Sequence, residues 1–516
     1  IQAVANEIGK RSTFMRNPSY PALTGFLTSA AYNLFLLGSV SAAVVNLSAI
    51  VMLGLPKLAA EFSFAGANTA MLKAMKTAAG RGENSWALNP RYKTLVTTLD
   101  KFGQREHTLQ KELQDGARAT VTDFESKGAK FLDMLSYPFT AAEKYSRATV
   151  AITAYELSLA SGKTEQEASD YAQQVVMDVH TTGIAAEGPR LAQHPIGRVM
   201  FTFKSWIWNS AVQTAFAAND SVKGADPETK RKARAEIIGI YGMSATVAGV
   251  NGLPYFGAAA TFANIIAALI PDDEDEPFNA RAWTREFVGD FAFKGPVNAA
   301  TNLEISDRTG IANGLLFRED PYSIEQNGYV LTAIMQAMGP VGSYALGIER
   351  GAGKLLAAGE YSRFAETVLP SAGRNVLKAG RYYFEGARTI DGAPIDTDIN
   401  GYNLFMQAFG FTPADLSNTY GRRADAANYE SKVLARKQKI LKKYYIGVTT
   451  GDTELANEAM GELNTFAQRY PALVKSNTLT SSFKSRQSYE QKLIKGLKFN
   501  DALTPELNER FFDDID

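Results

Sequence analysis

Two long stretches of the sequence carry no charged side chain, and they constrain the fold more than any other feature. The first runs over 39 residues from Pro18 to Pro56, and the second over 35 residues from Ile237 to Pro271. A helix of about 20 apolar residues spans the hydrocarbon layer of a bilayer. Each stretch is therefore long enough to cross a membrane, or to fold back as a pair of helices. A buried core or a subunit interface is the alternative for both.

The rest of the chain has the composition of a protein that lives in water. It carries 54 basic and 54 acidic residues, so its formal net charge is zero, and its mean hydropathy is −0.16. A net charge of zero gives no long-range attraction to nucleic acid or anionic lipid, so any such contact must come from a local patch. The chain has no cysteine and three histidines, which excludes disulfides and thiolate sites and leaves few histidine ligands. The sequence predicts no metal and no cofactor.

Helical signals recur along the whole chain. Thr164 and Glu167 form a predicted capping box, in which each side chain accepts from the other residue's backbone N–H, and apolar residues follow at helical spacing. Gly451 and Asp452 indicate a helix end followed at once by a new N-cap. Alternating strand patterns are scarce. We therefore expect an all-α, elongated multi-helix assembly protein with two or three long uncharged Ala/Gly-rich helical segments, the third over 327–348.

Changes in composition divide the chain into five predicted segments. The acidic run 272–276 between two prolines indicates a solvated loop, and a turn-rich region follows it. The segments are an apolar region of membrane-active or interface helices (1–62), an amphipathic helical domain (63–235), an apolar helical hairpin (236–271), a turn-rich connector with a weakly apolar helix (272–360) and a charged helical domain (361–516).

Small residues one turn apart in both uncharged stretches permit close helix–helix contact, as in Gly38–Ala42 and Ala245–Gly249. The second stretch is broken by glycine and proline over 252–257, which favours a hairpin of two short helices. In the first stretch the large apolar residues are sufficient for insertion. The predicted membrane contacts are Leu34, Phe35, Leu37, Val44, Val45 and Ile50.

Near the end of the chain, basic residues recur at spacings of four, three and four, which places them on one face of a helix. Such a face suits phosphate contacts without reading of base sequence. A solvated outer face is the alternative, since runs of charge are often only that. The candidate DNA contacts are Lys432, Arg436, Lys439 and Lys443.

Two groups of segments resemble a known class of phage protein. The first group comprises 137–139, 143–149, 154–156 and 194–206, and the second comprises 374–379, 386–389, 392–395 and 409–413. Together they resemble the helical C-terminal region of large bacteriophage polyvalent and internal virion (DNA-ejection) proteins of short-tailed phages. The similarity covers roughly residues 130–480 and carries no catalytic residue.

The resemblance implies a protein stored inside the virion and expelled to the host envelope, its periplasm and inner membrane, as part of a conduit for the genome. The implied partners are further copies of the chain, other internal virion proteins, the portal or tail, phage double-stranded DNA contacted without sequence preference, and the host inner membrane. We expect no enzymatic activity, because the sequence holds no metal, nucleotide or nucleophile–base signature. The alternative is the scaffold part of a giant virion-packaged polyvalent protein, whose polymerase, lytic or protease domain lies outside this chain.

Overall fold

The computed structural model describes residues 2–16, 22–36, 38–105, 127–180, 190–201, 205–269, 278–309, 339–389 and 392–494. Most of them are helical. Within these ranges the only strands, β1 (Ala387–Arg388) and β2 (Pro394–Asp396), form one short antiparallel pair. The predicted all-α, multi-helix class is confirmed.

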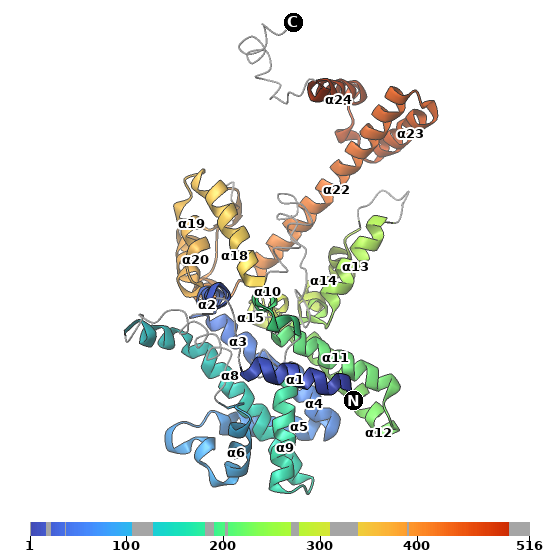
Figure 1. Cartoon of the computed structure of the whole chain (residues 1–516). Helices are drawn as coiled ribbons and strands as arrows, with labels where there is room; N and C mark the ends of the chain where they lie inside the picture. Colours follow the sequence, from blue (N-terminus) through green and yellow to red (C-terminus); the bar gives the residue numbers. More distant parts are fainter. Residues whose placement is uncertain are drawn as a thin grey trace. The chain divides into compact units, whose positions relative to one another are not determined.

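The chain divides into two compact units. Unit 1 comprises residues 1–266 and 279–422, and unit 2 comprises residues 267–278 and 423–516. Figure 1 shows the helices of unit 1, which are α1 (Gln2–Arg16), α2 (Ala22–Phe35), α3 (Val40–Ala49), α4 (Leu55–Glu61), α5 (Phe64–Ala78), α6 (Lys93–Lys101), α8 (Lys127–Ala160), α9 (Glu165–Val179), α10 (Pro195–Met200), α11 (Ser205–Lys223), α12 (Pro227–Ala248), α13 (Phe256–Leu269), α14 (Ala280–Lys294), α15 (Pro296–Thr301), α16 (Ser306–Thr309), α18 (Gly339–Arg350), α19 (Tyr361–Val368), α20 (Ser371–Glu385) and α21 (Gly401–Ala408). A long helix, α22 (Ala414–Thr450), begins in unit 1 and continues into unit 2, which also holds α23 (Thr453–Arg469) and α24 (Thr478–Ile494).

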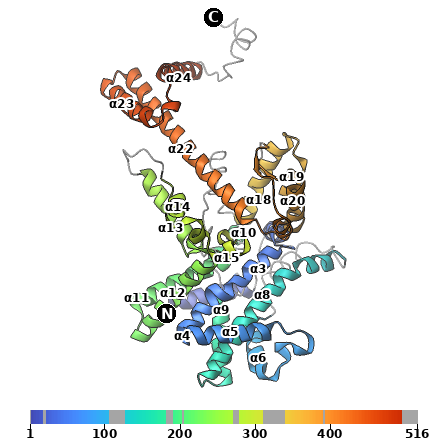
Figure 2. The same cartoon turned by 180° about the vertical axis from the view of Figure 1, so that it is seen from behind.

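The main core of unit 1 is built around the first uncharged stretch. There α3 continues through a π-helical turn, η1 (Ile50–Gly54), into α4, and the run packs among α5, α8, α9 and α12 (Figure 2). A β-carbon at Gly54 would lie 3.0 Å from Val150 Cγ2, so glycine permits α8 to approach closely here. The core side chains that this run contributes are Ile50, Met52, Leu53, Leu55 and Leu58.

The helix ends follow the local signals in the sequence. Thr164 caps α9: its Oγ1 accepts from Glu167 N at 3.3 Å, and the Glu167 carboxylate accepts from Thr164 N at 2.9 Å. α22 ends at Thr450, and Asp452 then caps α23 by accepting from Leu455 N at 3.0 Å. Both predicted helix starts are confirmed.

The second uncharged stretch is interrupted between two helices, but the interruption begins at Gly249, before the predicted 252–257, and its first helix, α12, is a 22-residue helix that starts at Pro227 instead of a short one. α12 ends at Ala248, and Gly249 adopts φ 64° before the short 3-10 turn η6 (Val250–Gly252) and α13. A β-carbon at Gly249 would lie 2.5 Å from the backbone oxygens of Ala292 and Phe293 in α14. The glycine therefore permits both the positive φ and the contact with α14.

Unit 2 has a small core of its own. Val433, Ile440 and Leu441 of α22 pack against Leu463 and Phe466 of α23. These three α22 residues lie on one face of the helix. The basic residues Lys432, Arg436, Lys439 and Lys443 flank them in the sequence of the same helix.

Candidate membrane and nucleic-acid contacts

The structure separates the six predicted membrane contacts. Ile50 lies in the core of unit 1 and is 1% exposed, whereas Val44 is 43% exposed. Leu34, Phe35 and Val45 are half-buried, and Leu37 lies outside the described residues. Phe35 contacts Tyr344 edge-on, with ring centroids 6.4 Å apart, and the Arg374 guanidinium lies 5.7 Å from its ring centroid. In the folded chain these residues do not form one exposed apolar face.

One continuous run among the described residues, Val40–Glu61, is long and apolar enough to cross a membrane. It has 22 residues, and half of its most apolar window is buried inside the fold. A buried core helix of a soluble protein has the same properties.

Ion pairs attach the charged end of this run to neighbouring helices. Lys57 Nζ lies 2.8 Å from the carboxylate of Asp178 in α9, and Glu61 pairs with Lys232 of α12 at 2.9 Å. The side chains from Ile50 to Leu58 thus supply most of the buried part of the run, Val44 is exposed, and ion pairs hold the charged end of the run against α9 and α12.

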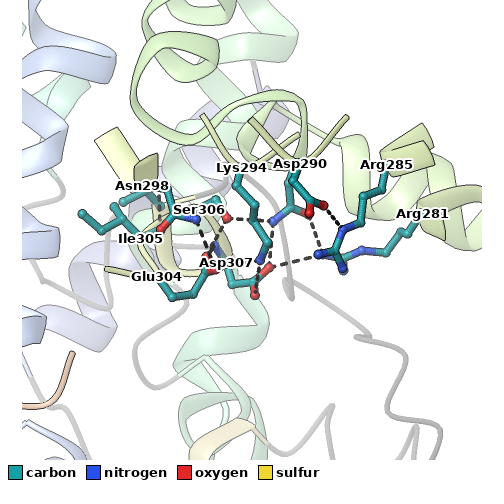
Figure 3. A network of polar contacts seen from close by, with 11 residues as sticks. Arg281, Arg285, Asp290, Lys294, Asn298, Glu304, Ile305, Ser306 and Asp307 are labelled. Carbon is teal, nitrogen blue, oxygen red and sulfur yellow. Dashed lines mark hydrogen bonds and ion pairs between the residues drawn. The ribbon is translucent and has the colours of Figure 1, made fainter. Parts of the chain in front are cut away.

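A buried network of polar side chains follows the second uncharged stretch (Figure 3). Lys294 Nζ donates to the Glu304 carboxylate at 2.8 Å, and these two side chains are 10% and 6% exposed. The remaining Glu304 contacts come from Ser306 Oγ at 2.6 Å, Asp307 N at 3.1 Å and Asn298 Nδ2 at 3.4 Å. Both oxygens of the buried carboxylate are therefore satisfied.

Asp307 links this network to the turn that ends the second uncharged stretch. Its Oδ1 accepts from Asn251 Nδ2 at 2.7 Å and lies 3.3 Å from Arg281, and its Oδ2 lies 3.3 Å from Lys294. Farther along α14, Asp290 pairs with Arg285 and Arg422 (the Arg285 pair is drawn in Figure 3). Since the two acids at its centre are fully engaged, the network acts as a structural anchor for α14 and α16.

The same anchor holds the start of α22. Glu304 N donates to Thr412 O at 2.8 Å, and Ala414 N donates to Asn302 O at 2.8 Å. Leu303 and Pro413 form a β-bridge between these two bonds. No local pattern predicts this arrangement, because the two turns that form it are more than 100 residues apart in the sequence.

A serine–histidine pair also lies in the core of unit 1. Ser146 Oγ and His180 Nε2 are 3.3 Å apart, and their residues are 0% and 4% exposed. Burial first, and then the nearby Arg147 guanidinium, lower the pKa of His180 to about 3. A general base works best with a pKa near the operating pH. This enclosed pair is therefore suited to packing rather than to nucleophilic catalysis.

The predicted DNA contacts on α22 have different surroundings. Lys443 lies between two acids of α23, 2.7 Å from Glu458 and 2.6 Å from Glu462. Lys432 Nζ donates to Phe278 O at 2.9 Å. Lys439 is exposed and Arg436 is half-buried. The stripe is therefore not a uniform cationic face: its charge is neutralised at Lys443 and accessible at Lys439.

No family model, curated protein or solved structure matches this chain. Its function is therefore inferred from its own residues and contacts.

Proposed function

We propose that the protein is a non-catalytic bacteriophage internal virion (ejection) protein. In this proposal it is released from the capsid and forms part of an oligomeric conduit that delivers the genome across the host cell envelope. Val40–Glu61 supports the proposal most, because it joins a membrane-spanning length and composition to a buried position in the folded chain. Such a helix is protected from water in storage and available to a bilayer after rearrangement.

Exposed aromatic side chains on α14 provide a second, weaker support. Trp283 and Phe287 lie one turn apart and are 56% and 77% exposed, and Phe291, which is 64% exposed, follows a kink at Gly289. The first two rings stack with centroids 5.5 Å apart. An exposed stacked aromatic pair of this kind is typical of a surface that becomes covered in an assembly or at a membrane.

The central test asks whether Val40–Glu61 must leave the core to act on a membrane. A β-carbon at Gly239 of α12 would lie 2.9 Å from Pro56 Cβ of α4, which is shorter than the separation of about 3.5–4.5 Å found in disulfides, so a bridge here requires a small outward shift of α12 from α4. The chain has no cysteine, so Pro56→Cys/Gly239→Cys introduces a single possible bridge. The assay is release of a self-quenched dye from vesicles of phosphatidylethanolamine and phosphatidylglycerol.

We expect the parent chain and the reduced double variant to release dye, and the oxidised double variant to lose this activity. The two single-cysteine variants, treated with the same oxidant, are the matched controls and should behave as the parent. No release by the parent chain at any lipid ratio would overturn the proposal. Release by the oxidised double variant would show that Val40–Glu61 acts without leaving α12.

A further inference from the structure

An open groove of about 570 Å³ runs between α22 and α24 in unit 2. α22 contributes Lys437, Gln438 and Leu441, and α24 contributes Arg486 and a row of hydroxyl groups. No residue that lines the groove is acidic. The hydroxyl-bearing residues are Thr478, Ser481, Ser482, Ser485 and Tyr489.

These hydroxyl groups form a track rather than a point site. They recur every three or four residues and so lie on one face of α24. From Thr478 to Tyr489 the helix rises about 16 Å, at about 1.5 Å per residue. A track of this length suits an extended chain of acceptors better than one small anion.

Protein contacts hold both cations of the groove in place. Arg486 Nη2 donates to the backbone oxygen of Gln438 at 3.2 Å, and Lys437 Nζ donates to Leu473 O at 2.7 Å. A guanidinium has five N–H donors and an ammonium has three, so each group keeps donors for a ligand after these bonds. Cations held in this way lose less conformational freedom on binding than mobile ones.

The positive charge near the groove is local to the helices that form it. Residues 423–494 hold twelve Lys and Arg residues and seven Asp and Glu residues, a formal net charge of +5, whereas unit 2 as a whole, which also includes 267–278 and 495–516, has a formal net charge of −3. Two of the acids within 423–494, Glu458 and Glu462, are paired with Lys443. Attraction of a polyanion therefore depends on the cations of the groove and not on the net charge of the unit.

We infer that the groove between α22 and α24 binds the sugar–phosphate backbone of a nucleic acid. Arg and Lys side chains, with Ser, Thr and Tyr hydroxyls, are the usual donors to phosphate oxygens, and such contacts carry no base sequence. Tyr489, which is 46% exposed at the far end of the track, offers its hydroxyl to a further phosphate oxygen. The inference rests on the proposed function, with double-stranded DNA as the expected ligand, and it places the contacts in the groove instead of along the predicted stripe.

The test compares two double variants of the full chain that remove equal charge from the same two helices. Lys437→Gln/Arg486→Gln removes the cations of the groove, and Lys439→Gln/Lys484→Gln removes two exposed cations outside it. Affinity for a fluorescently labelled 30-base-pair duplex is measured by anisotropy over a range of salt concentrations. We expect the groove variant to bind at least about tenfold more weakly at 100 mM salt, and its log–log salt slope to shrink by about 1.8, because each phosphate contact contributes about 0.9. The control should lose less than about threefold.

A third variant keeps the test valid if the loss of Lys437 disturbs the fold. Ser481→Ala/Ser485→Ala changes two exposed helix positions where alanine is a better helix former. It should weaken binding about three- to tenfold with an unchanged salt slope, because hydroxyls are neutral.

Three outcomes would overturn the inference. Equal weakening in the groove variant and the control would return DNA contact to the predicted stripe and leave the proposed function intact. Unchanged affinity in the serine variant, with the fold intact, would remove the hydroxyl track from the site. Binding of polyglutamate but not DNA would assign the groove to an acidic polypeptide; the dye-release assay then still decides the membrane part of the proposed function.

Discussion

Lys294→Met should destabilise unit 1 strongly, because it removes the one cation that the described residues place within ion-pair distance of the buried Glu304 carboxylate. Glu304 keeps three hydrogen-bond donors without Lys294, but its negative charge then has no cation within ion-pair distance among the described residues. Breaking a buried pair by removing one partner costs about 3–5 kcal/mol. Asp307 retains Arg281 and Asn251, so we expect the lower end of that range, about 3 kcal/mol.

The assay is denaturant unfolding followed by tryptophan fluorescence. All four tryptophans, at positions 86, 206, 208 and 283, belong to unit 1, so the signal reports that unit alone. The matched control is Arg231→Met, which breaks a 2.7 Å pair with Glu228 whose side chains are 61% and 57% exposed; because water screens this pair, the variant should leave the unfolding midpoint almost unchanged. A loss in Lys294→Met no larger than in the control would refute the anchor role of the network.

Two further predictions concern unit 1. The low pKa of His180 leaves it neutral in the folded state, while the unfolded chain takes up a proton below about pH 6.5. The free energy of unfolding should therefore fall as the pH drops from about 6.5 toward 3, by up to about 1.4 kcal/mol per pH unit, and His180→Gln should flatten this dependence in unfolding midpoints measured at pH 7 and pH 5. Thr164→Ala should cost about 1 kcal/mol in the same fluorescence assay, because it removes the cap of α9; Thr164→Ser should retain most of that stability, and equal stability of all three chains would contradict the capping role.

The all-α class and several helix ends could be predicted because their causes are local. The Thr164 cap and the Gly451–Asp452 junction depend on residues three or four positions apart, and such pairs can be recognised in a sequence. The break after α12 is predictable for the same reason, since glycine and proline act on their own backbone.

The surroundings of the candidate sites could not be predicted, because they depend on tertiary contacts. Ile50 is apolar whether its neighbours are lipid tails or the side chains of α8, so hydrophobicity alone cannot choose between them. Helical spacing predicts that Lys443 lies on a basic face of α22, but it does not predict that α23 packs against Lys443. The two acids Glu458 and Glu462, one turn apart in the sequence, are the feature that could have indicated this contact. The buried Lys294–Glu304 pair had no comparable signal, since a turn and α15 separate its members.

The charged end of Val40–Glu61 limits how this run could enter a bilayer under the proposed function. The uncharged part, Val40–Pro56, would extend about 25 Å as a helix, slightly less than the roughly 30 Å hydrocarbon layer. Lys57 and Glu61 would then lie at one membrane surface, which orients the helix. Lys57 lies 2.8 Å from Asp178 and 3.8 Å from Glu236, and its side chain is 24% exposed, so its release breaks a largely buried cluster of charges. The Glu61–Lys232 pair, whose side chains are both 33% exposed, is the weaker restraint.

The larger free-energy cost of membrane insertion comes from the core of unit 1 that Val40–Glu61 would leave. Each of the five large core side chains from Ile50 to Leu58 contributes about 1.5–3 kcal/mol by its burial. Burial in a bilayer can offset the lost burial free energy of the side chains that leave. The helices α5, α8 and α12, however, would be left with an exposed apolar surface. Contacts between copies of the chain are one way to cover that surface. Dye release should therefore rise more steeply than linearly with protein concentration, because insertion and oligomerisation would stabilise each other; strictly linear release at fixed lipid would indicate that single chains insert alone.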